Sequence, residues 1–440
     1  MRKQIFFCVM ACVAGLSCSS PKQANDGSPF VSVKDGQFIR HNQPYYYVGA
    51  NFWYGAILGS EGTGGNRRRL TAELDSLKSM GVDNLRILVG SDGRRGVPAK
   101  VEPTLQTAPG VYNDTILAGL DYLLAEMRKR DMLAVLYLNN SWEWSGGYGQ
   151  YLEWAGHGKA PVPAVDGWPA YMDYVKQFPR SEKAKKLFAN YVKDIITRTN
   201  RYTGVKYTDD PTVMSWQIGN EPRAFSPENK DAFAQWIGET AALIDSLAPN
   251  QLISTGSEGK HGCEEDLQLF EKIHADGHVD YMNIHIWPYN WGWAKEDRLT
   301  ECLDSARKET KAYIDEHLAI ARKYSKPIVI EEFGYPRDGF RFNKEASVTA
   351  RDDYYSFIFS LVSENARTGG LLAGCNFWAW GGNATLSASH SFWKPGDDYT
   401  GDPAQEAQGL NSVFSSDTTT IRLIRQANEA VGKCSGEKAD

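Results

Sequence analysis

Several features that would place this chain in other classes of protein are scarce or missing. After residue 16, no apolar run is long enough to cross a bilayer. The net charge of −6 argues against a polyanionic partner such as nucleic acid. No glycine-rich phosphate loop follows the first strand-like run. Because neither the cysteines nor the histidines have the spacing of a metal site, we expect no metal and no cofactor.

Cysteine is also scarce: four of the seven, at positions 263, 302, 375 and 434, lie beyond the first 18 residues. An exported protein can form disulfides, but four cysteines allow three complete pairings. The sequence does not choose among them.

The first residues resemble a secretory signal. Arg2 and Lys3 precede an apolar stretch from Ile5 to Leu16, too short for a membrane-spanning helix. Cys18 then stands where bacterial lipoproteins carry their lipid. We predict a lipoprotein-type signal over residues 1–17, lipidation of Cys18 and a polar tether over residues 18–29. The protein would be exported and attached to the bacterial envelope only through this lipid; plain secretion is the alternative.

The remaining sequence alternates strand-like and helix-like segments. Amphipathic stretches at helical spacing cover residues 70–77, 116–127 and 312–324, and residues 418–431 add a final one. Eight apolar, strand-like runs precede or separate them: Tyr45–Trp53, Asn84–Val89, Leu133–Asn139, Val213–Asn220, Leu252–Ser257, Tyr281–Trp287, Pro327–Phe333 and Leu372–Trp380. This alternation predicts an α/β fold, a (β/α)8 TIM barrel, with an open doubly wound sheet as the alternative.

We assign this barrel to one domain over residues 30–434, followed by a short tail over residues 435–440. A strand over Phe30–Arg40 is expected to cap its bottom. Long connections follow the third strand (Ser141–Arg180) and the eighth (Gly381–Asp417), at the end of the barrel where active sites are built.

Two glutamates end apolar strand-like runs. Glu221 lies in WQIGNEP (216–222) and Glu332 in IVIEEFG (328–334). A carboxylate at the end of a core strand is costly to bury unless it has a chemical role. Paired carboxylates are the usual means of cleaving a glycosidic bond. The alternative is that each forms a structural ion pair. Strand alternation places the neighbouring Glu331 on the opposite face, between barrel and helices.

These segments resemble the retaining β-glycosidases, in which strands four and seven supply the two carboxylates. Further segments resemble glycoside hydrolase family 5, and within it the β-1,4-mannanases: GANFW (49–53), LNN (138–140), GGYGQYLEW (146–154) and FWAWG (377–381). The likeness spans nearly the whole chain after the signal.

The resemblance implies a role for each matching residue. Glu221 would be the acid/base and Glu332 the nucleophile. Asn220 would contact the sugar on the glycone side, and Arg86 would keep the nucleophile ionised. Asn139, in the LNN segment, would support the site.

His285 and Trp287 match a His-x-Tyr motif of the family with one departure, because tryptophan replaces the tyrosine. An indole N–H can still donate a hydrogen bond, but with a different reach. A satisfied interior histidine is the alternative for His285.

Aromatic residues are abundant, with 13 Trp and 22 Tyr. Many of the tryptophans fall at the ends of strand-like runs or in the following loops, where an indole face can stack on a sugar ring. We expect Trp53 and Trp378 to be substrate platforms, and Trp216 and Trp236 to pack in the core. The acidic residues Asp397, Asp398 and Asp402 are expected to form a solvated loop.

Together these features predict an endo-acting β-1,4-mannanase that hydrolyses mannan, glucomannan or galactomannan with retention. Alternatives within the family are a cellulase, a xyloglucanase or an exo-acting mannosidase. An alternative of another class is a lipoprotein that binds glycans without cleaving them.

Overall fold

The computed structural model describes residues 27–436, with side chains up to residue 433. The predicted signal, Cys18 and most of the predicted tether lie outside the described residues. Among the residues described, no helix combines the length and apolar character needed to span a bilayer.

Eight parallel strands form the central sheet, and all eight were predicted. In chain order they are β4 (Tyr47–Asn51), β5 (Asn84–Leu88), β8 (Leu133–Tyr137), β9 (Val213–Gln217), β10 (Leu252–Ser254), β11 (Met282–Ile286), β12 (Ile328–Phe333) and β13 (Leu372–Phe377). Apart from β10 and β11, each strand pairs with the next along the chain, and β13 returns to pair with β4.

Asp280 joins the two strands that have no ladder between them. Its backbone N–H donates to the carbonyl of Ile253 (2.8 Å), and its carboxylate accepts from the N–H of Ile253 (2.8 Å). The sheet is therefore a nearly closed barrel, as the alternation of strands and helices predicts.

Helices surround the barrel, and short strands lie outside it. The helices are α1 (Gly55–Gly59), α2 (Arg67–Ser79), α3 (Asp114–Lys129), α4 (Gly147–Ala155), α5 (Pro163–Asp166), α6 (Trp168–Val175), α7 (Glu182–Ile196), α8 (Lys230–Leu247), α9 (Leu267–His274), α10 (Leu303–Tyr324), α11 (Thr349–Thr368) and α12 (Thr418–Gly436). The short strands are β1 (Ser32–Lys34), β2 (Gln37–Arg40), β3 (Gln43–Pro44), β6 (Gln106–Ala108), β7 (Val111–Tyr112), β14 (Trp380–Gly382) and β15 (Val413–Phe414).

The sequence explains these elements locally. All eight barrel strands are buried along their whole length, which suits the near-continuous apolar runs of a parallel sheet. The helices are amphipathic: α7 buries Phe188, Val192 and Ile195 on one face. The side chain of Ser181 caps its first turn by accepting from the N–H of Ala184.

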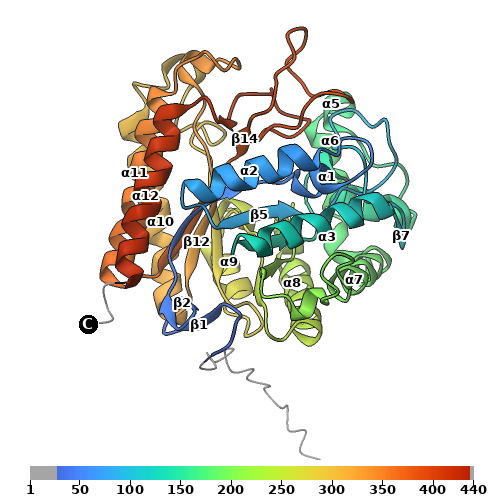
Figure 1. Cartoon of the computed structure of the whole chain (residues 1–440). Coiled ribbons are helices and arrows are strands. Elements are labelled where there is room, and N and C mark those ends of the chain that lie inside the picture. Colours follow the sequence, from blue (N-terminus) through green and yellow to red (C-terminus); the bar gives the residue numbers. More distant parts are fainter. Residues whose placement is uncertain (1–26, 437–440) are drawn as a thin grey trace, which may run out of the picture.

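The bottom of the barrel is closed by a hairpin where a single strand was expected. Strands β1 and β2 pair in antiparallel fashion. Phe38 of β2 is fully buried, edge-on to Tyr281 at 5.2 Å. Together with apolar residues from the barrel strands, the two rings form a separate core cluster. In Figure 1 this hairpin lies at the bottom and the long loop before α12, in red, at the top.

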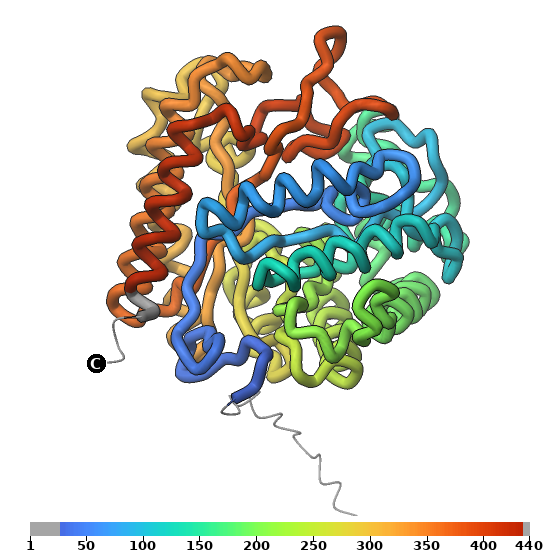
Figure 2. The backbone as a smooth tube through the Cα atoms, in the orientation of Figure 1, coloured from blue at the N-terminus to red at the C-terminus, as the bar shows by residue number. Residues whose placement is uncertain are grey.

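That last loop, after β13, crosses the upper end of the barrel (Figure 2). It is tied to α2, because the guanidinium of Arg69 donates to the carbonyls of Tyr399 (2.8 Å) and Gly381 (3.2 Å). The other long connection, after β8, is largely helical and contains α4, α5 and α6.

A bulge in β12 overturns the expectation for Glu331. Ile284 pairs with Ile330 and the next residue, His285, pairs with Glu332, so Glu331 is an extra residue in the ladder. The bulge resets the alternation of side chains, and both glutamates face the barrel interior. The predicted position of Glu331 between barrel and helices is therefore wrong.

Candidate active site

Glu221 and Glu332 meet at the carboxyl end of the barrel. Both are nearly buried, with exposed fractions of 8% and 2%. A carboxylate oxygen of each and a ring nitrogen of His285 all lie within 4.8 Å of one another. The Nδ1 atom of His285 is 2.8 Å from Glu221 and 3.4 Å from Glu332. Residues 111 positions apart thus form a single constellation.

Arg86 organises the floor of this site from β5. Its side chain is fully buried, and its guanidinium donates to the carboxylate of Glu332. Its remaining hydrogen bonds go to the side-chain oxygens of Asn51 (3.1 Å), Gln217 (2.8 Å) and Asn220 (2.9 Å). The ion pair expected from the sequence is present, and the same guanidinium also orients Asn220.

Burial raises the pKa of both carboxyl groups, and repulsion from Glu221 raises the pKa of Glu332 further. The guanidinium of Arg86 opposes this rise at Glu332, which it contacts directly. Two carboxyl groups this close do not ionise independently. The charge of Arg86 also lowers the pKa of Glu221, so its guanidinium favours the ionised form of both carboxyl groups and contacts that of Glu332 directly.

His285 is fully buried, and burial lowers its pKa well below the usual value, with a contribution from the charge of Arg86. It is therefore neutral at neutral pH and contacts Glu221 as a hydrogen-bonding partner rather than as a cation. The sequence left open whether it is an ordinary interior histidine; the structure places it against both carboxylates.

Glu331 belongs to a polar network below the two carboxylates. It accepts hydrogen bonds from the amides of Gln217 and Asn283 and from the hydroxyl of Tyr281. The amide of Gln217 also accepts from Arg86 and so links the two layers. A buried carboxylate needs hydrogen-bond donors to offset its burial, and Glu331 finds them in this network. Because Gln217 bonds to both Glu331 and Arg86, the network also holds Arg86 in position.

Glu221 has an unusual backbone conformation, with φ of +50°. Few side chains other than glycine and asparagine adopt this left-handed region, and such strain persists only where surrounding contacts hold it. The N–H of Glu221 donates to the carbonyl of Gly256 (2.9 Å), and its carbonyl accepts from the hydroxyl of Ser141. Its carboxylate accepts from the indole N–H of Trp142.

The two glutamates open into a cavity of about 440 Å³, a usual size for a ligand site. Its lining includes Asn220, Trp287 and Trp378 as expected for substrate-binding residues. The Trp287 and Trp378 rings meet edge-on at 6.0 Å. Trp53 is not among the lining residues: it is 3% exposed and its indole N–H donates to Gly401.

Trp287 acts on Glu221. A hydrogen bond from Trp287 contributes to lowering the pKa of Glu221 against the effect of burial. The resemblance to the His-x-Tyr motif predicts a hydrogen-bond donor near the nucleophile, whereas the indole of Trp287 donates to Glu221 instead.

Of the remaining predicted residues, Asn139 is buried and supports the backbone. Its side-chain oxygen accepts from the N–H of Asn140 (2.7 Å), and its carbonyl accepts from the N–H of Asn220 (2.8 Å). Trp216 and Trp236 are buried in the core, as predicted.

The cysteines that the structure describes with side chains, Cys263, Cys302 and Cys375, are free.

Several residues of the cavity were not found from the sequence. Glu406 reaches it from the last loop, and burial together with the charges of Asp402 and Glu221 raises its pKa to about 8. Its Oε2 atom is buried without a hydrogen-bond partner. Trp168 and Met172 line the cavity from α6. No motif surrounds these residues, so only the folded loops reveal them.

Asp402 is not solvated, contrary to expectation. It is 1% exposed and accepts from the N–H groups of Gly409 (2.8 Å), Asn411 (2.9 Å) and Ser412 (3.2 Å) and from the Ser412 hydroxyl. This carboxylate holds the last loop in shape, since it satisfies three backbone donors that the loop would otherwise bury unpaired.

Glu221, His285 and Glu332 have the atoms and spacing to hold a metal ion. The fit is poor, because the carboxylate of Glu332 already accepts from a guanidinium and that of Glu221 from an indole N–H. A guanidinium beside the site would repel a cation.

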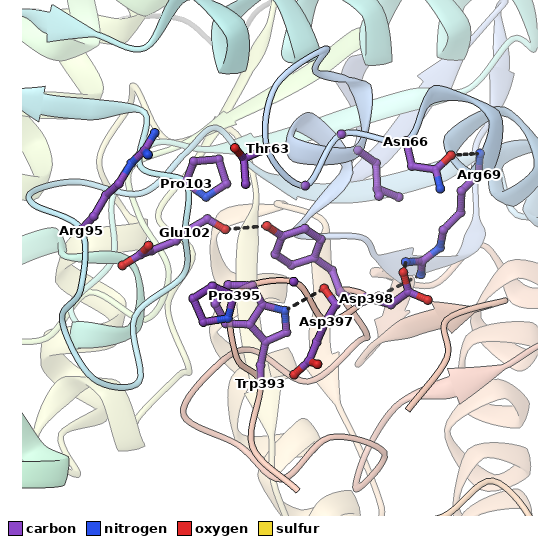
Figure 3. Close-up of a pocket in the computed structure, with 15 residues that line it drawn as sticks. Thr63, Asn66, Arg69, Arg95, Glu102, Pro103, Trp393, Pro395, Asp397 and Asp398 are labelled. Atoms are coloured by element: carbon purple, nitrogen blue, oxygen red, sulfur yellow. Dashed lines mark hydrogen bonds and ion pairs between the residues drawn. The ribbon is translucent and has the colours of Figure 1, made fainter. Parts of the chain in front are cut away.

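A second cavity of about 220 Å³ lies between the loop after β5, the start of α2 and the last loop (Figure 3). It shares no lining residue with the cavity of the two glutamates. Two side chains around it donate to backbone carbonyls: the hydroxyl of Tyr399 to that of Glu102, and the indole of Trp393 to that of Asp397. Glu221, Glu332 and the tryptophans around them line the first cavity and not this one.

Known proteins resemble the chain over most of its length. The sequence model of the family described as "GH family 5 beta-mannosidase-like" matches residues 28–436. A rice protein named putative mannan endo-1,4-beta-mannosidase 9 is 31% identical over 365 residues, covering 79% of this chain and 82% of the relative. Mannan endo-1,4-beta-mannosidase 7 of Arabidopsis thaliana is 29% identical over 395 residues, covering 86% and 84%.

Among solved structures, a glycoside hydrolase family 5 mannosidase from Rhizomucor miehei has a TM-score of 0.85 and 32% identity, and the match covers 93% of this chain and all of that one. A mutant of that enzyme was solved in complex with mannosyl-fructose. The endo-β-1,4-mannanase from Thermotoga petrophila shares the fold, with a TM-score of 0.64 and 23% identity over 90% of this chain and 78% of that one.

Proposed function

The chain belongs to the β-mannosidase-like group of glycoside hydrolase family 5, and we propose that it hydrolyses β-1,4-mannosidic bonds in mannan, glucomannan or galactomannan. The observation that carries this is the convergence of Glu221, Glu332 and Arg86 in a cavity lined by tryptophans. Curated relatives named as mannan endo-1,4-β-mannosidases support the substrate class.

We propose that Glu332 is the nucleophile and Glu221 the acid/base. In the first step the carboxylate of Glu332 attacks the anomeric carbon, the bond to the leaving oxygen breaks, and Glu221 gives that oxygen its proton. In the second step Glu221 takes a proton from water, whose oxygen attacks the anomeric carbon and releases Glu332. Two inversions at one carbon give net retention.

The separation of the two glutamates supports retention. Their nearest oxygens lie within 4.8 Å. Carboxyl groups about 5–5.5 Å apart are typical of retaining enzymes, whereas inverting enzymes keep about 6.5–9.5 Å to admit a water. The first step needs a protonated Glu221 and an ionised Glu332, and we assign the charge to Glu332 because the guanidinium of Arg86 donates directly to its carboxylate.

The remaining groups are proposed to bind the glycone sugar. Asn220 is held by Arg86 with its amide at the cavity wall, and Trp378 offers an indole beside Trp287. These side chains pair a flat apolar surface with a fixed hydrogen-bonding group, as pyranose binding requires.

Endo action on the polymer is our first choice, and exo action on chain ends is a second candidate. The Rhizomucor enzyme, named a mannosidase, favours the second through its 32% identity and TM-score of 0.85. Viscosity of a galactomannan solution separates them: an endo enzyme lowers it early, when few reducing ends have formed, whereas an exo enzyme releases sugar with little change in viscosity.

Reducing-sugar release from mannan, cellulose and xyloglucan tests the proposed substrate. Wild-type enzyme should act on mannan fastest, and Glu332→Ala and Glu221→Ala should be inactive. Faster cleavage of cellulose would contradict the substrate class, and binding of mannan without release would favour a glycan-capture protein. With Glu221→Ala and an activated aryl mannoside, added azide should restore turnover and give a β-mannosyl azide, which tests retention directly.

We also propose export and lipid attachment through Cys18. The support is the sequence of residues 1–29 alone. Labelled fatty acid should be incorporated by the wild type in a bacterial host, whereas Cys18→Ala should appear unlabelled; equal labelling of both would contradict this.

A further inference from the structure

Helix α6, within the long connection after β8, presents two large apolar side chains to solvent. Trp168 is 45% exposed and Met172 is 37% exposed. They are four residues apart and so share one face of the helix, while Tyr171 and Val175 are buried. Both exposed side chains line the cavity of the two glutamates. Exposed apolar surface at the rim of a ligand cavity marks a binding surface.

The Trp168 ring is held in place before any ligand binds. It meets Trp142 edge-on at 5.6 Å and Tyr171 at 6.1 Å. The hydroxyl of Tyr171 donates to the carbonyl of Ser141 (2.7 Å), and the Ser141 hydroxyl donates to the carbonyl of Glu221. A ring supported in this way loses little conformational entropy on binding, which makes it an effective platform.

The position of α6 identifies the side of the scissile bond that it serves. The indole of Trp142 contacts the carboxylate of Glu221, and Trp168 packs against Trp142. The carboxylate of Glu332 is contacted instead by Arg86 of β5 and His285 of β11. Because an acid/base residue protonates the oxygen of the leaving group, α6 lies on the leaving-group side.

We infer that Trp168 and Met172 form a binding subsite for a leaving-group sugar of the polysaccharide. The sugar's C–H face stacks on the indole of Trp168, and Met172 extends the apolar surface with an adaptable thioether side chain. This rests on the proposed function, since it assumes that Glu221 is the acid/base. It makes α6 a determinant of preference for long substrates over short ones.

Two substrates that differ only in the leaving group test the inference. Mannohexaose places sugars on the leaving-group side, whereas β-mannosyl fluoride leaves as fluoride and cannot reach α6. Trp168→Ala should lower kcat/KM for mannohexaose on the order of tenfold, a loss typical of one aromatic contact, and leave the fluoride rate unchanged. Trp168→Phe, which keeps an aromatic face, should recover most of the loss.

Phe392→Ala is the matched control. Phe392 is 54% exposed and does not line the cavity, so its removal should change neither rate. An unchanged kcat/KM for mannohexaose in Trp168→Ala would overturn the inference, and so would an equal fall for both substrates. Failure of the wild type to cleave either substrate would instead overturn the proposed function.

Discussion

Replacing Arg86 tests how the site holds a charged nucleophile. Arg86→Met keeps an unbranched apolar stem and removes the charged guanidinium, whereas Arg86→Lys keeps the charge and removes the planar fork. The guanidinium serves four acceptors, one of them the carboxylate of Glu332. An ammonium group cannot reach all four from one position.

The expected losses of stability differ between the two variants. Removing one partner of a buried ion pair costs about 3–5 kcal/mol, which we expect for Arg86→Met at pH 7. Arg86→Lys leaves buried acceptors unpaired but compensates the charge, and should cost about 1–3 kcal/mol. Urea unfolding measures both through the shift of the midpoint at constant slope.

The loss for Arg86→Met should depend on pH. The pKa of Glu332 is already raised in the folded protein by burial, and Arg86 opposes the rise. Without Arg86 the folded state holds a proton up to a still higher pH, while the unfolded state releases it near the ordinary carboxyl pKa. The folded state then binds more protons within this window, so the free energy of unfolding falls as pH rises through it. The difference from wild type should therefore be larger at pH 8 than at pH 5.

Kinetics provide an independent measurement of the same effect. The first step requires Glu332 to be ionised, so a higher pKa for this group should move the acidic limb of the kcat/KM profile to higher pH in Arg86→Met. An acidic limb that stays in place, together with a stability loss equal at pH 5 and pH 8, would refute the role given to Arg86.

Three further variants have outcomes that follow from the same structure. Burial and nearby charges raise the pKa of Glu406 to about 8, so it is mostly neutral at pH 7 and becomes charged near Glu221 at higher pH. Glu406→Gln removes this ionisation and should abolish a fall in kcat/KM centred near pH 8. An unchanged pH profile would contradict this. Trp287→Phe removes a hydrogen bond that lowers the pKa of Glu221. The alkaline limb of the kcat/KM profile should therefore move to higher pH while its acidic limb stays. No movement of the alkaline limb would argue against the contact. Asp402→Ala leaves three loop N–H groups without their acceptor. Faster limited proteolysis within residues 383–412 should report the loosened loop, with Lys394→Ala, at an exposed position of the same loop, as the control.

The main elements of the barrel could be predicted because their signals are local. A strand buried on both faces needs a continuous apolar run, and a surrounding helix needs an apolar stripe, so both are visible in short windows of sequence. The strand ends were less accurate: the predicted Leu372–Trp380 stops at Phe377, and a separate short strand begins at Trp380.

Glu331 shows where local reasoning fails. Alternation along β12 predicts opposite faces for Glu331 and Glu332, and a single extra residue in the ladder with β11 reverses that result. The bulge depends on the register between two strands, which the sequence of one strand does not contain. It places a second carboxylate beneath the nucleophile and lets Gln217 link it to Arg86.

Trp53 and Trp168 show that sequence motifs do not identify which tryptophans reach the cavity. Trp53 follows the first strand within a recognisable motif, yet the last loop covers it and Gly401 accepts from its indole. Trp168 lies in no motif, yet α6 exposes it at the rim of the cavity. Which tryptophan faces solvent depends on how long loops fold over one another, and composition has no bearing on that.

Short contiguous patterns were enough to predict the barrel, the family and the two carboxyl residues that meet at its carboxyl end. The hydrogen-bonding network that the charged groups share, and the set of aromatic rings that reach the cavity, became visible only in the folded chain. These properties arise from distances between residues far apart in the chain, and from the burial that the closed barrel and its two long loops impose on them.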